Sequence, residues 1–428
     1  MKFGGRIVGD VTVLSVRCDA ALKSGHRTTH ETPGLGSMTM GVAWAWPHAT
    51  LDNSMKVDIL VELAREVADA LCKEQTLGHP LEIARRMAEI RDIAASKLVV
   101  KWSLDSPIPD LALLLATSPL EAALFDAQGK AASVSSYLLL GKEFVKNDLS
   151  FELGPAYRGR YLDEFVSEVP VSSLPLYHLV GALDPLSPEE VEREIGDGLP
   201  ETLGQWIVRD GLTHLKIKLA GDDFDWDRQR ILRIHEVATV HAVAPQRWHY
   251  SLDFNERCES ADYVLQLLDA VEVDSRDAFE AIQYVEQPTH RDLASHPDNL
   301  MHAVARRVPV VIDESLTDLA SLRLAVEQGY SGIALKACKG HSEALLMAAV
   351  ARHEGLYLCV QDLTCIGASL LHSVSLASHI PGVAAVESNG RQYCPRGNEA
   401  WKASFPGMFD VRDGQVPSRL LSGAGLGY

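Results

Sequence analysis

The sequence lacks the cysteine patterns that stabilise small secreted domains or bind structural zinc. Its seven cysteines are odd in number, and no two of them form a C-x-x-C pair. Disulfide frameworks use cysteines in pairs and zinc ribbons use C-x-x-C motifs, so neither is predicted. We therefore expect a protein of the reducing cytoplasm.

Positive charge is scarce. The chain has 40 lysines and arginines against 58 aspartates and glutamates, a formal net charge of −18. Nucleic acids and anionic membranes bind basic surfaces, so neither is an expected partner. A small-molecule substrate is expected instead.

Long apolar runs are also missing. No run approaches the roughly 18 residues that a membrane helix needs. The first residues, "MKFGGRIVGDVTVLSV", are interrupted by Asp10, which argues against a signal peptide. With 428 residues, 46% of them hydrophobic, the chain is long enough for two domains or for one large barrel with additions.

The first third of the chain predicts a separate α+β unit. Strand-like patterns in 6–18 and 37–46 flank a stretch rich in glycine and histidine, which we expect to be a long, mobile loop. Trp44 and Trp46 alternate on the second strand, where packing is the expected role. Helical periodicity then runs to about residue 140, with one helix predicted to begin at a Ser118 cap and Glu121 three residues on.

From residue 174 onward, short apolar segments alternate with amphipathic helices. Eight β units separated by helices predict a parallel α/β barrel, and no G-x-G-x-x-G follows any strand to favour an open nucleotide-binding sheet. The predicted strands lie at 175–181, 213–221, 249–255, 281–287, 308–315, 331–337, 355–362 and 382–389.

Six of these strands end in polar or ionisable residues. The C-terminal ends of parallel barrel strands meet at one mouth, where catalytic groups are placed. Three carboxylates from successive strands form an all-oxygen set that suits Mg²⁺, and without a cation they would repel one another. The polar strand ends are Lys218, Asp253, Glu286, Asp313 with Glu314, Lys336 and Asp362.

Two lysines flank the carboxylates along the sequence. On a closed eight-stranded circle Lys218 and Lys336 lie on opposite sides of a substrate carboxylate, so one could remove the α-proton and the other return it. A lysine base needs its pKa lowered by roughly 3, or about 4 kcal/mol. Lys216 shares a face with Lys218 and is expected to supply part of that effect.

The ordered motifs resemble the enolase superfamily, within it the mandelate racemase and muconate lactonizing enzyme proteins, and by its two lysines the muconate lactonizing branch. The motifs are "KIK", "LDFNE", "VEQP", "IDES" and "ALKACKG" on five successive strands, "EAALFDAQGKAASVSSYLLLG" in the first third and "GLG" near the end. The resemblance implies a (β/α)7β TIM-like barrel with an N-terminal α+β capping domain. It divides the chain into a cap at 1–165 with a specificity loop near 18–36, a barrel at 166–395, and a segment at 396–428 that returns to the cap.

The resemblance also implies roles for individual residues. It implies one Mg²⁺, with Mn²⁺ as an alternative ion, and by analogy a homo-oligomer. Its metal ligands would be Asp253, Glu286 and Asp313, its acid/base groups Lys218 and Lys336 with Lys216 as helper, and its surrounding polar groups Asn255 and Glu314. Candidates for substrate contact are His26 and His30 in the specificity loop, and Asp362 and Glu387 at the last two strands.

Some features depart from that branch. The interval from Asp253 to Glu286 is long, "ACKGHSEA" lacks the usual second glycine after Lys339, and the seventh strand ends in Asp362 instead of the histidine of mandelate racemases. We expect racemisation or epimerisation of a small carboxylate. The alternatives are dehydration of an acid sugar or hydroxy acid, cycloisomerisation, a Schiff-base aldolase, and a non-enzymatic acid-binding barrel.

Overall fold

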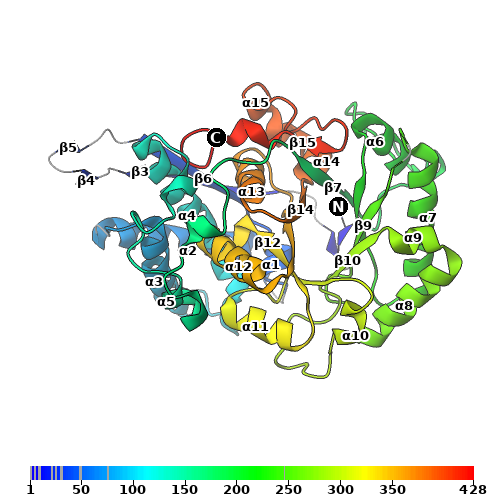
Figure 1. Ribbon diagram of the computed structural model, residues 1–428, viewed down its shortest axis with the longest axis horizontal. Coiled ribbons are helices and arrows are strands. Elements are labelled where there is room, and N and C mark those ends of the chain that lie inside the picture. The colour runs from blue at the N-terminus through cyan, green and yellow to red at the C-terminus, as the bar shows by residue number, and fades with distance from the viewer. Residues whose placement is uncertain are drawn as a thin grey trace.

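The computed structural model describes residues 2–3, 6–7, 11–20, 23–24, 27–28, 32–47, 51–74, 77–244 and 246–428. A domain built on a two-stranded sheet and long helices lies beside a closed barrel (Figure 1). No helix among the described residues has the length and apolar character needed to span a bilayer. Two further strand pairs, β1 with β2 and β4 with β5, span Lys2–Phe3, Arg6–Ile7, Lys23–Ser24 and Arg27–Thr28.

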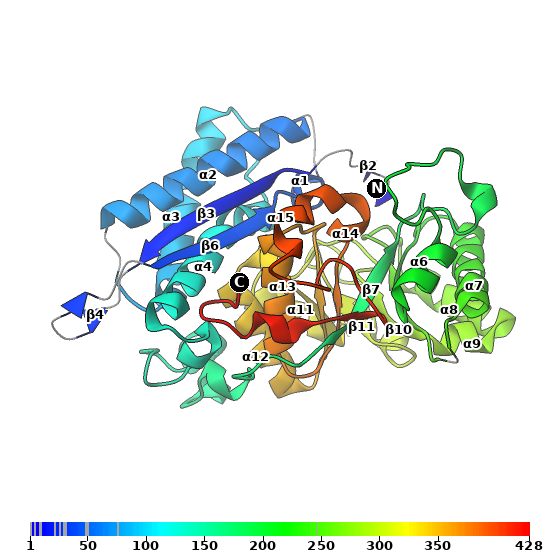
Figure 2. The same ribbon diagram turned by 90° about the horizontal axis from the view of Figure 1, so that it is seen from above.

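The first domain packs an antiparallel strand pair against long helices (Figure 2). Strand β6 begins well before the predicted second strand, because Gly34 and Gly36 belong to it. A Cβ at either glycine would collide with the backbone of α4, so the missing side chains allow helix and strand to approach closely. The elements are β3 (Val13–Ala20), β6 (Thr32–Thr39), α2 (Asn53–Glu74), α3 (Pro80–Lys101) and α4 (Asp110–Ala132).

Two local predictions in this domain are wrong. Helix α4 begins at Asp110, and Ser118 lies inside it, donating its hydroxyl to Leu115 O at 3.0 Å. Trp44 and Trp46 do not alternate on a strand, because the chain turns after Thr39 into the short helix α1 (Val42–Ala45). Both predictions used only neighbouring residues, whereas the positions of α4 and of this turn depend on packing against the barrel, which is distant in sequence.

Helix α4 is buried on all its faces between Leu111 and Gly129, in keeping with a sequence whose apolar residues do not gather on one side. The strands β3 and β6 pack on it, and barrel residues 337–339 and α12 also contact it. Its Asp126 accepts hydrogen bonds from Leu35 N at 2.8 Å and Leu426 N at 2.9 Å, and pairs with Lys130 at 2.6 Å. The D-x-x-G-K motif therefore connects the helix, the hairpin and the C-terminal segment.

The second domain is the predicted eight-stranded parallel barrel, and all eight predicted strands are confirmed. Neighbouring strands pair in chain order, and β14 closes the circle against β7. A short strand, β15 (Gln415–Val416), pairs antiparallel with β7 outside the circle. The barrel strands are β7 (Leu174–Val180), β8 (His214–Lys218), β9 (His249–Asp253), β10 (Ile282–Glu286), β11 (Val310–Ile312), β12 (Gly332–Lys336), β13 (Tyr357–Gln361) and β14 (Val383–Glu387).

Helices connect the barrel strands and cover the outside of the barrel. Helix α6 shows the local signals: Thr202 and Gln205 form its capping box, and Gly211, in the left-handed conformation at φ 62°, ends it. The long interval after Asp253 holds two consecutive helices, α8 and α9. The helices are α6 (Leu203–Asp210), α7 (Phe224–His241), α8 (Ala261–Asp274), α9 (Arg276–Glu280), α10 (His302–Ala305), α11 (Leu319–Glu327), α12 (His341–Glu354), α13 (Ala368–His379) and α14 (Gly390–Tyr393), with α5 (Ser150–Leu153) before the barrel and α15 (Glu399–Lys402) after it.

Candidate active site

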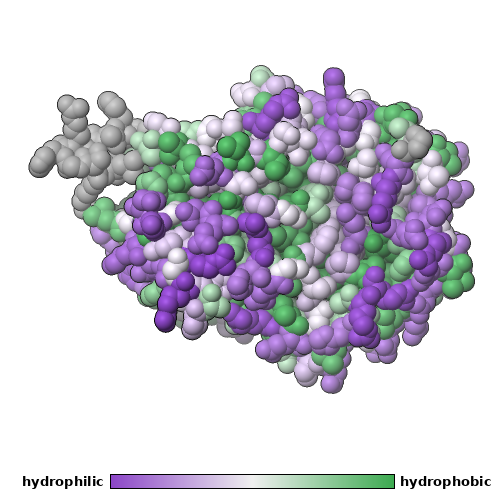
Figure 3. All heavy atoms as spheres, in the orientation of Figure 1, coloured by the Kyte–Doolittle hydropathy of each residue, from purple (hydrophilic) through white to green (hydrophobic). Residues whose placement is uncertain are grey.

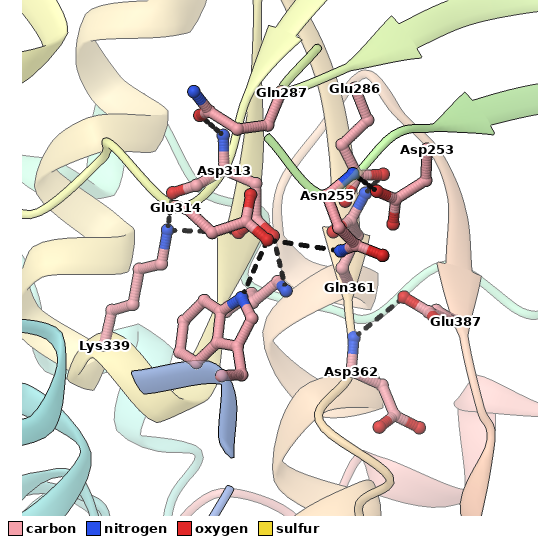
Figure 4. Close-up of polar contacts among 12 residues, drawn as sticks. Asp253, Asn255, Glu286, Gln287, Asp313, Glu314, Lys339, Gln361, Asp362 and Glu387 are labelled. Atoms are coloured by element: carbon pink, nitrogen blue, oxygen red, sulfur yellow. Dashed lines mark hydrogen bonds and ion pairs between the residues drawn. The ribbon is translucent and has the colours of Figure 1, made fainter. Parts of the chain in front are cut away.

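The polar strand ends meet at the barrel mouth, as the parallel arrangement requires. Every one of them is buried, and even the most exposed, Lys218, shows only 8% of its surface. Figure 4 shows Asp253, Glu286, Asp313, Glu314 and Glu387 around one space. Burial of so many charges is tolerated because each finds a partner of opposite sign or a polar donor.

On one side of this space the lysines of β8 bind the carboxylates of β9 and β10. Lys216 Nζ lies 3.1 Å from Asp253 Oδ2, 2.9 Å from Glu286 Oε1 and 3.3 Å from Glu387 Oε2. Lys218 Nζ donates to the same Asp253 oxygen. The two lysines two residues apart therefore share one face of the strand, as their spacing predicts.

On the other side Lys336, at the end of β12, pairs with Asp313 at 2.7 Å. Lys339 follows in the 3-10 turn Ala337–Lys339 and also binds Asp313, through its backbone carbonyl and at 3.3 Å through Oδ1. Asp313 is thus paired with the ammonium groups of both Lys336 and Lys339. Lys339 was not among the residues assigned a role from sequence, although it stands in the motif "ALKACKG".

Turns after the strands hold the carboxylates in place. Gln287 and Asn255, directly beyond β10 and β9, have φ values of 30° and 46°, outside the usual range for side chains with a Cβ. Asn255 N donates to Asp253 Oδ1 at 2.9 Å, and Gln287 Oε1 accepts from Asp313 N at 3.0 Å. Gln361 donates to Glu286. Sequence reasoning missed Gln287 and Gln361, since nothing in the strand pattern distinguishes a buried glutamine with partners from an ordinary one.

A side chain of the capping domain closes the site. Trp44 Nε1 donates to Glu314 Oε1 at 3.1 Å, and its ring lies 4.5 Å from Lys336 Nζ. Asn255 Nδ2 donates to the same Glu314 oxygen at 3.3 Å. Arg291 fixes the turn by donating to Trp44 O at 3.1 Å. The Trp44 side chain therefore packs over the barrel mouth.

Of the four candidates for substrate contact, two are placed by the structure. Asp362 accepts from Cys365 N and Asn389 N, both at 2.7 Å, so its carboxylate organises the loops after β13 and β14. Glu387 contacts Lys216 and Asn389. Their positions beside the carboxylates keep them candidates. His26 and His30 lie outside the described residues.

The electrostatics of the carboxylates are uneven. Burial acts to raise the pKa of Asp253, but Lys218 and Lys216 hold it well below its usual range. The pKa of Asp313 falls to about 2 because Lys336 and Lys339 outweigh burial. Glu286 differs, since burial and the charge of Asp253 raise its pKa well above normal despite Lys216. The lysines therefore favour the charged forms of Asp253 and Asp313, but they do not overcome the burial of Glu286.

Burial, with the neighbouring charge of Asp313, also raises the pKa of Glu314 to about 7, and burial with Glu387 raises that of Asp362 to about 7. The lysines show the reverse balance. Burial alone would lower the pKa of Lys216 and Lys336, but Glu286 raises the first and Asp313 the second above the ordinary value. The lowered lysine pKa expected from sequence is thus not present at Lys336 while Asp313 is its partner.

The residues present fit a magnesium ion in chemistry and charge. Six carboxylates and four lysines gather at the mouth, a formal charge of −2 when all ten groups are ionised. Within the described residues, Glu314 Oε2 and Asn255 Oδ1 are buried oxygens without a hydrogen-bond partner. Among the described residues, no group of three His, Cys, Asp or Glu side chains has the geometry to hold a metal ion. In this structure lysines pair with Asp253, Glu286 and Asp313 instead. The ligand set Asp253, Glu286 and Asp313 remains a prediction.

A comparison with protein-family models shows which family this chain belongs to. The family model described as enolase C-terminal domain-like matches residues 199–428. The chain belongs to this family. The enolase-superfamily assignment, with its mandelate racemase and muconate lactonizing enzyme branch, is thereby confirmed, and so is the assignment as an enzyme. The coarse chemistry that membership supports is magnesium-dependent proton abstraction.

Solved structures with the same fold match most of the length of this enolase-superfamily protein. The muconate lactonizing enzyme of Klebsiella pneumoniae has a TM-score of 0.56 at 17% identity, covering 97% of this chain and 91% of its own. The L-Ala-D/L-Glu epimerase of Bacillus subtilis has a TM-score of 0.55 at 17% identity, with 89% and 88% covered. An enolase of Gibberella zeae PH-1, complexed with magnesium, formate and sulfate, has a TM-score of 0.56 at 16% identity, with 98% and 87% covered. No curated protein matches the sequence.

Proposed function

We propose that this protein racemises or epimerises a small carboxylate by magnesium-dependent removal and return of its α-proton. The observation that carries the proposal is the placement of Lys218 and Lys336. They come from opposite sides of the barrel, and each binds a different carboxylate of the predicted metal set, Asp253 or Asp313. A substrate between them presents one face to each lysine.

Asp253, Glu286 and Asp313 would hold the magnesium ion, with Asn255 and Glu314 close by. When bound, the ion supplies positive charge that stabilises an enediolate. The excess negative charge of the mouth and the raised pKa of Glu286 support a cation at these oxygens. The same cation would compete with the lysines for the carboxylate oxygens, and its positive charge nearby would favour a neutral lysine amine.

The proton transfers are made by the lysines. The α-carbon–hydrogen bond breaks as the neutral Lys218 amine takes the proton, and the electron pair enters the enediolate. Lys336 then gives a proton to the opposite face of the α-carbon, which inverts it. For the other enantiomer the two lysines exchange roles. Lys216, bound to Glu286 and Glu387, keeps a permanent positive charge beside Lys218.

Closure by Trp44 supports this chemistry. The indole shields Lys336 from bulk water and holds Glu314 by a hydrogen bond. Exclusion of water strengthens every charge interaction in the mouth and protects a carbanionic intermediate from adventitious protons. The L-Ala-D/L-Glu epimerase and the N-succinyl Arg/Lys racemase of Bacillus cereus among the structural relatives support trying amino-acid derivatives as substrates.

The test is α-proton exchange in D₂O with Mg²⁺, using dipeptides, N-acyl amino acids and acid sugars. Lys218→Met and Lys336→Met should each abolish exchange from one face, and Lys97→Met on the exposed surface of α3 serves as the matched control. Loss of water from the substrate would indicate a dehydratase, and ring closure a cycloisomerase. Undiminished exchange in both site variants would refute the proposal.

A further inference from the structure

A second cavity lies away from the barrel mouth, between the capping domain and the outside of the barrel. Its volume is about 700 Å³, in the range of small-molecule sites. Helices α3 and α4 form one wall, the segment from Leu140 to Leu162 another, and the beginning of α12 the third. Figure 1 shows these elements together, and hydrophilic side chains gather over α3 and α5 on the same face in Figure 3.

Part of the wall of this cavity is formed by leucine side chains. Leu113 and Leu114 come from α4, Leu149 and Leu162 from the connecting segment, and Leu346 from α12. All but Leu149 and Leu162 also belong to long helices whose positions are set by packing against the barrel or the hairpin. A ligand here would place an alkyl or aromatic body against leucine side chains.

One end of the cavity is polar and negative. Glu121, inside α4, accepts from Ser342 N at 2.9 Å and so occupies the beginning of α12. Ser342 also lines the cavity, is only 6% exposed, and has its hydroxyl beside the Glu121 carboxylate. Glu343 adds a second carboxylate, which makes no hydrogen bond or ion pair within the described chain.

The two arginines of the cavity are paired with other acids, and only Arg91 offsets part of the charge of Glu121 and Glu343. Arg85 pairs with Glu152 at 2.5 Å, and Arg91 pairs with Asp92 at 3.0 Å. They are the only lysines or arginines among its lining residues in the described chain. A cationic group that enters the cavity would therefore meet an ionised Glu343 without a cationic partner in contact with it.

We propose that this cavity is a binding site for an organic cation with an apolar body, a primary ammonium or guanidinium carried on an alkyl or aryl group. The cationic head binds Glu343 and Glu121, with the Ser342 hydroxyl as an additional acceptor, and the body packs on Leu113, Leu114 and Leu346. This site is independent of the proposed reaction. It contacts the first turn of α12, which begins two residues after Lys339.

Protonation of the acids should weaken binding. Burial raises the pKa of Glu343 to about 7, and the facing charges of Glu121, Asp318 and Glu152 act in the same direction, whereas Arg91 opposes them. A cation binds the ionised carboxylate. Affinity is therefore expected to fall as the pH drops from 8 to 6.

The experiment is calorimetric titration of the whole protein with hexylammonium at pH 8, with hexanol and hexanoate as matched probes. Hexylammonium should bind with a Kd of about 1 mM or tighter, hexanol more weakly and hexanoate not at all. Glu343→Gln should weaken hexylammonium about tenfold or more. Glu354→Gln, on the exposed end of the same helix, should leave it unchanged.

Other results would overturn the proposal. Equal affinity for hexylammonium and hexanol would make the cavity a neutral apolar site. Equal binding by wild type and Glu343→Gln would place the cation elsewhere, and no heat at 10 times the expected Kd would exclude the site. Because the readout is binding and not turnover, its failure is distinct from failure of the proposed racemisation.

Discussion

His379 provides a pH-dependent contact between the two domains. It ends α13 of the barrel and is stacked on Tyr137 from the capping side, with ring centroids 3.7 Å apart and an angle of 8°. Its Nδ1 hydrogen bonds with Ser375 O at 2.9 Å, and its Nε2 is buried without a partner among the described residues. A charged ring would leave that second N–H unsatisfied, so the fold favours the neutral imidazole.

Burial lowers the pKa of His379 to about 4, from 6.5. As the pH falls below 6.5 the unfolded chain binds the proton while the folded chain does not, so the contribution of neutral His379 is present above pH 6.5 and is lost as the pH falls toward 4. Between pH 8 and pH 5 the loss is about 2 kcal/mol. Other groups titrate in the same range, so the effect must be measured as a difference between proteins.

The perturbation is His379→Gln, which keeps a polar side chain but has no titration in this range. The free energy of unfolding of both proteins is measured by urea denaturation at pH 8 and pH 5. The variant should be less stable at pH 8 because it loses the stacking, and its deficit should shrink by about 2 kcal/mol at pH 5. His353→Gln, at an exposed position of α12, is the control and should show no such change. An equal deficit at both pH values would refute the reasoning.

Three further predictions concern the domain contacts and the site. Asp126→Ala should lower the free energy of unfolding by at least about 3 kcal/mol in urea denaturation, because two backbone amides and Lys130 lose a buried charged acceptor. Asp126→Asn should lower it by less. A decrease below about 1 kcal/mol in Asp126→Ala would contradict this prediction. Trp44→Phe should slow α-proton exchange about fivefold, because the variant loses one hydrogen bond to Glu314, and its circular dichroism should be unchanged. An unaltered exchange rate would count against that contact. Mg²⁺ should raise the melting temperature of wild type by several degrees and EDTA should reverse it, with a smaller rise in Glu286→Gln; equal rises in both would place the ion elsewhere.

The barrel and the positions of its polar strand ends were predictable because both follow from short-range pattern. A buried parallel strand has a nearly continuous apolar sequence, and its last residue faces the mouth. The ends of two such apolar runs therefore locate Lys218 and Asp253 at the mouth from the sequence alone. Their mutual contact follows from the pairing of neighbouring strands in register.

The errors arise where distant parts of the chain meet. Ser118 and Glu121 have the spacing of a capping box, yet both lie inside α4, and Glu121 instead binds the beginning of α12 more than 200 residues later. Gly34 and Gly36 suggested a loop, but α4 requires small residues there. Trp44 faces Glu314 only because the capping domain sits on the barrel. No local pattern contains this information.

The tight closure over Lys336 has a kinetic consequence. Lys218 and Lys336, the proposed acid/base groups, are nearly inaccessible, and the indole of Trp44 lies against Lys336. We therefore expect a ligand to enter or leave when the turn that carries this indole moves away. Each catalytic cycle then includes an opening step, and the frequency of that step sets a ceiling on turnover that faster chemistry cannot exceed. Solvent viscosity should slow such an enzyme more than isotopic substitution of its substrate does.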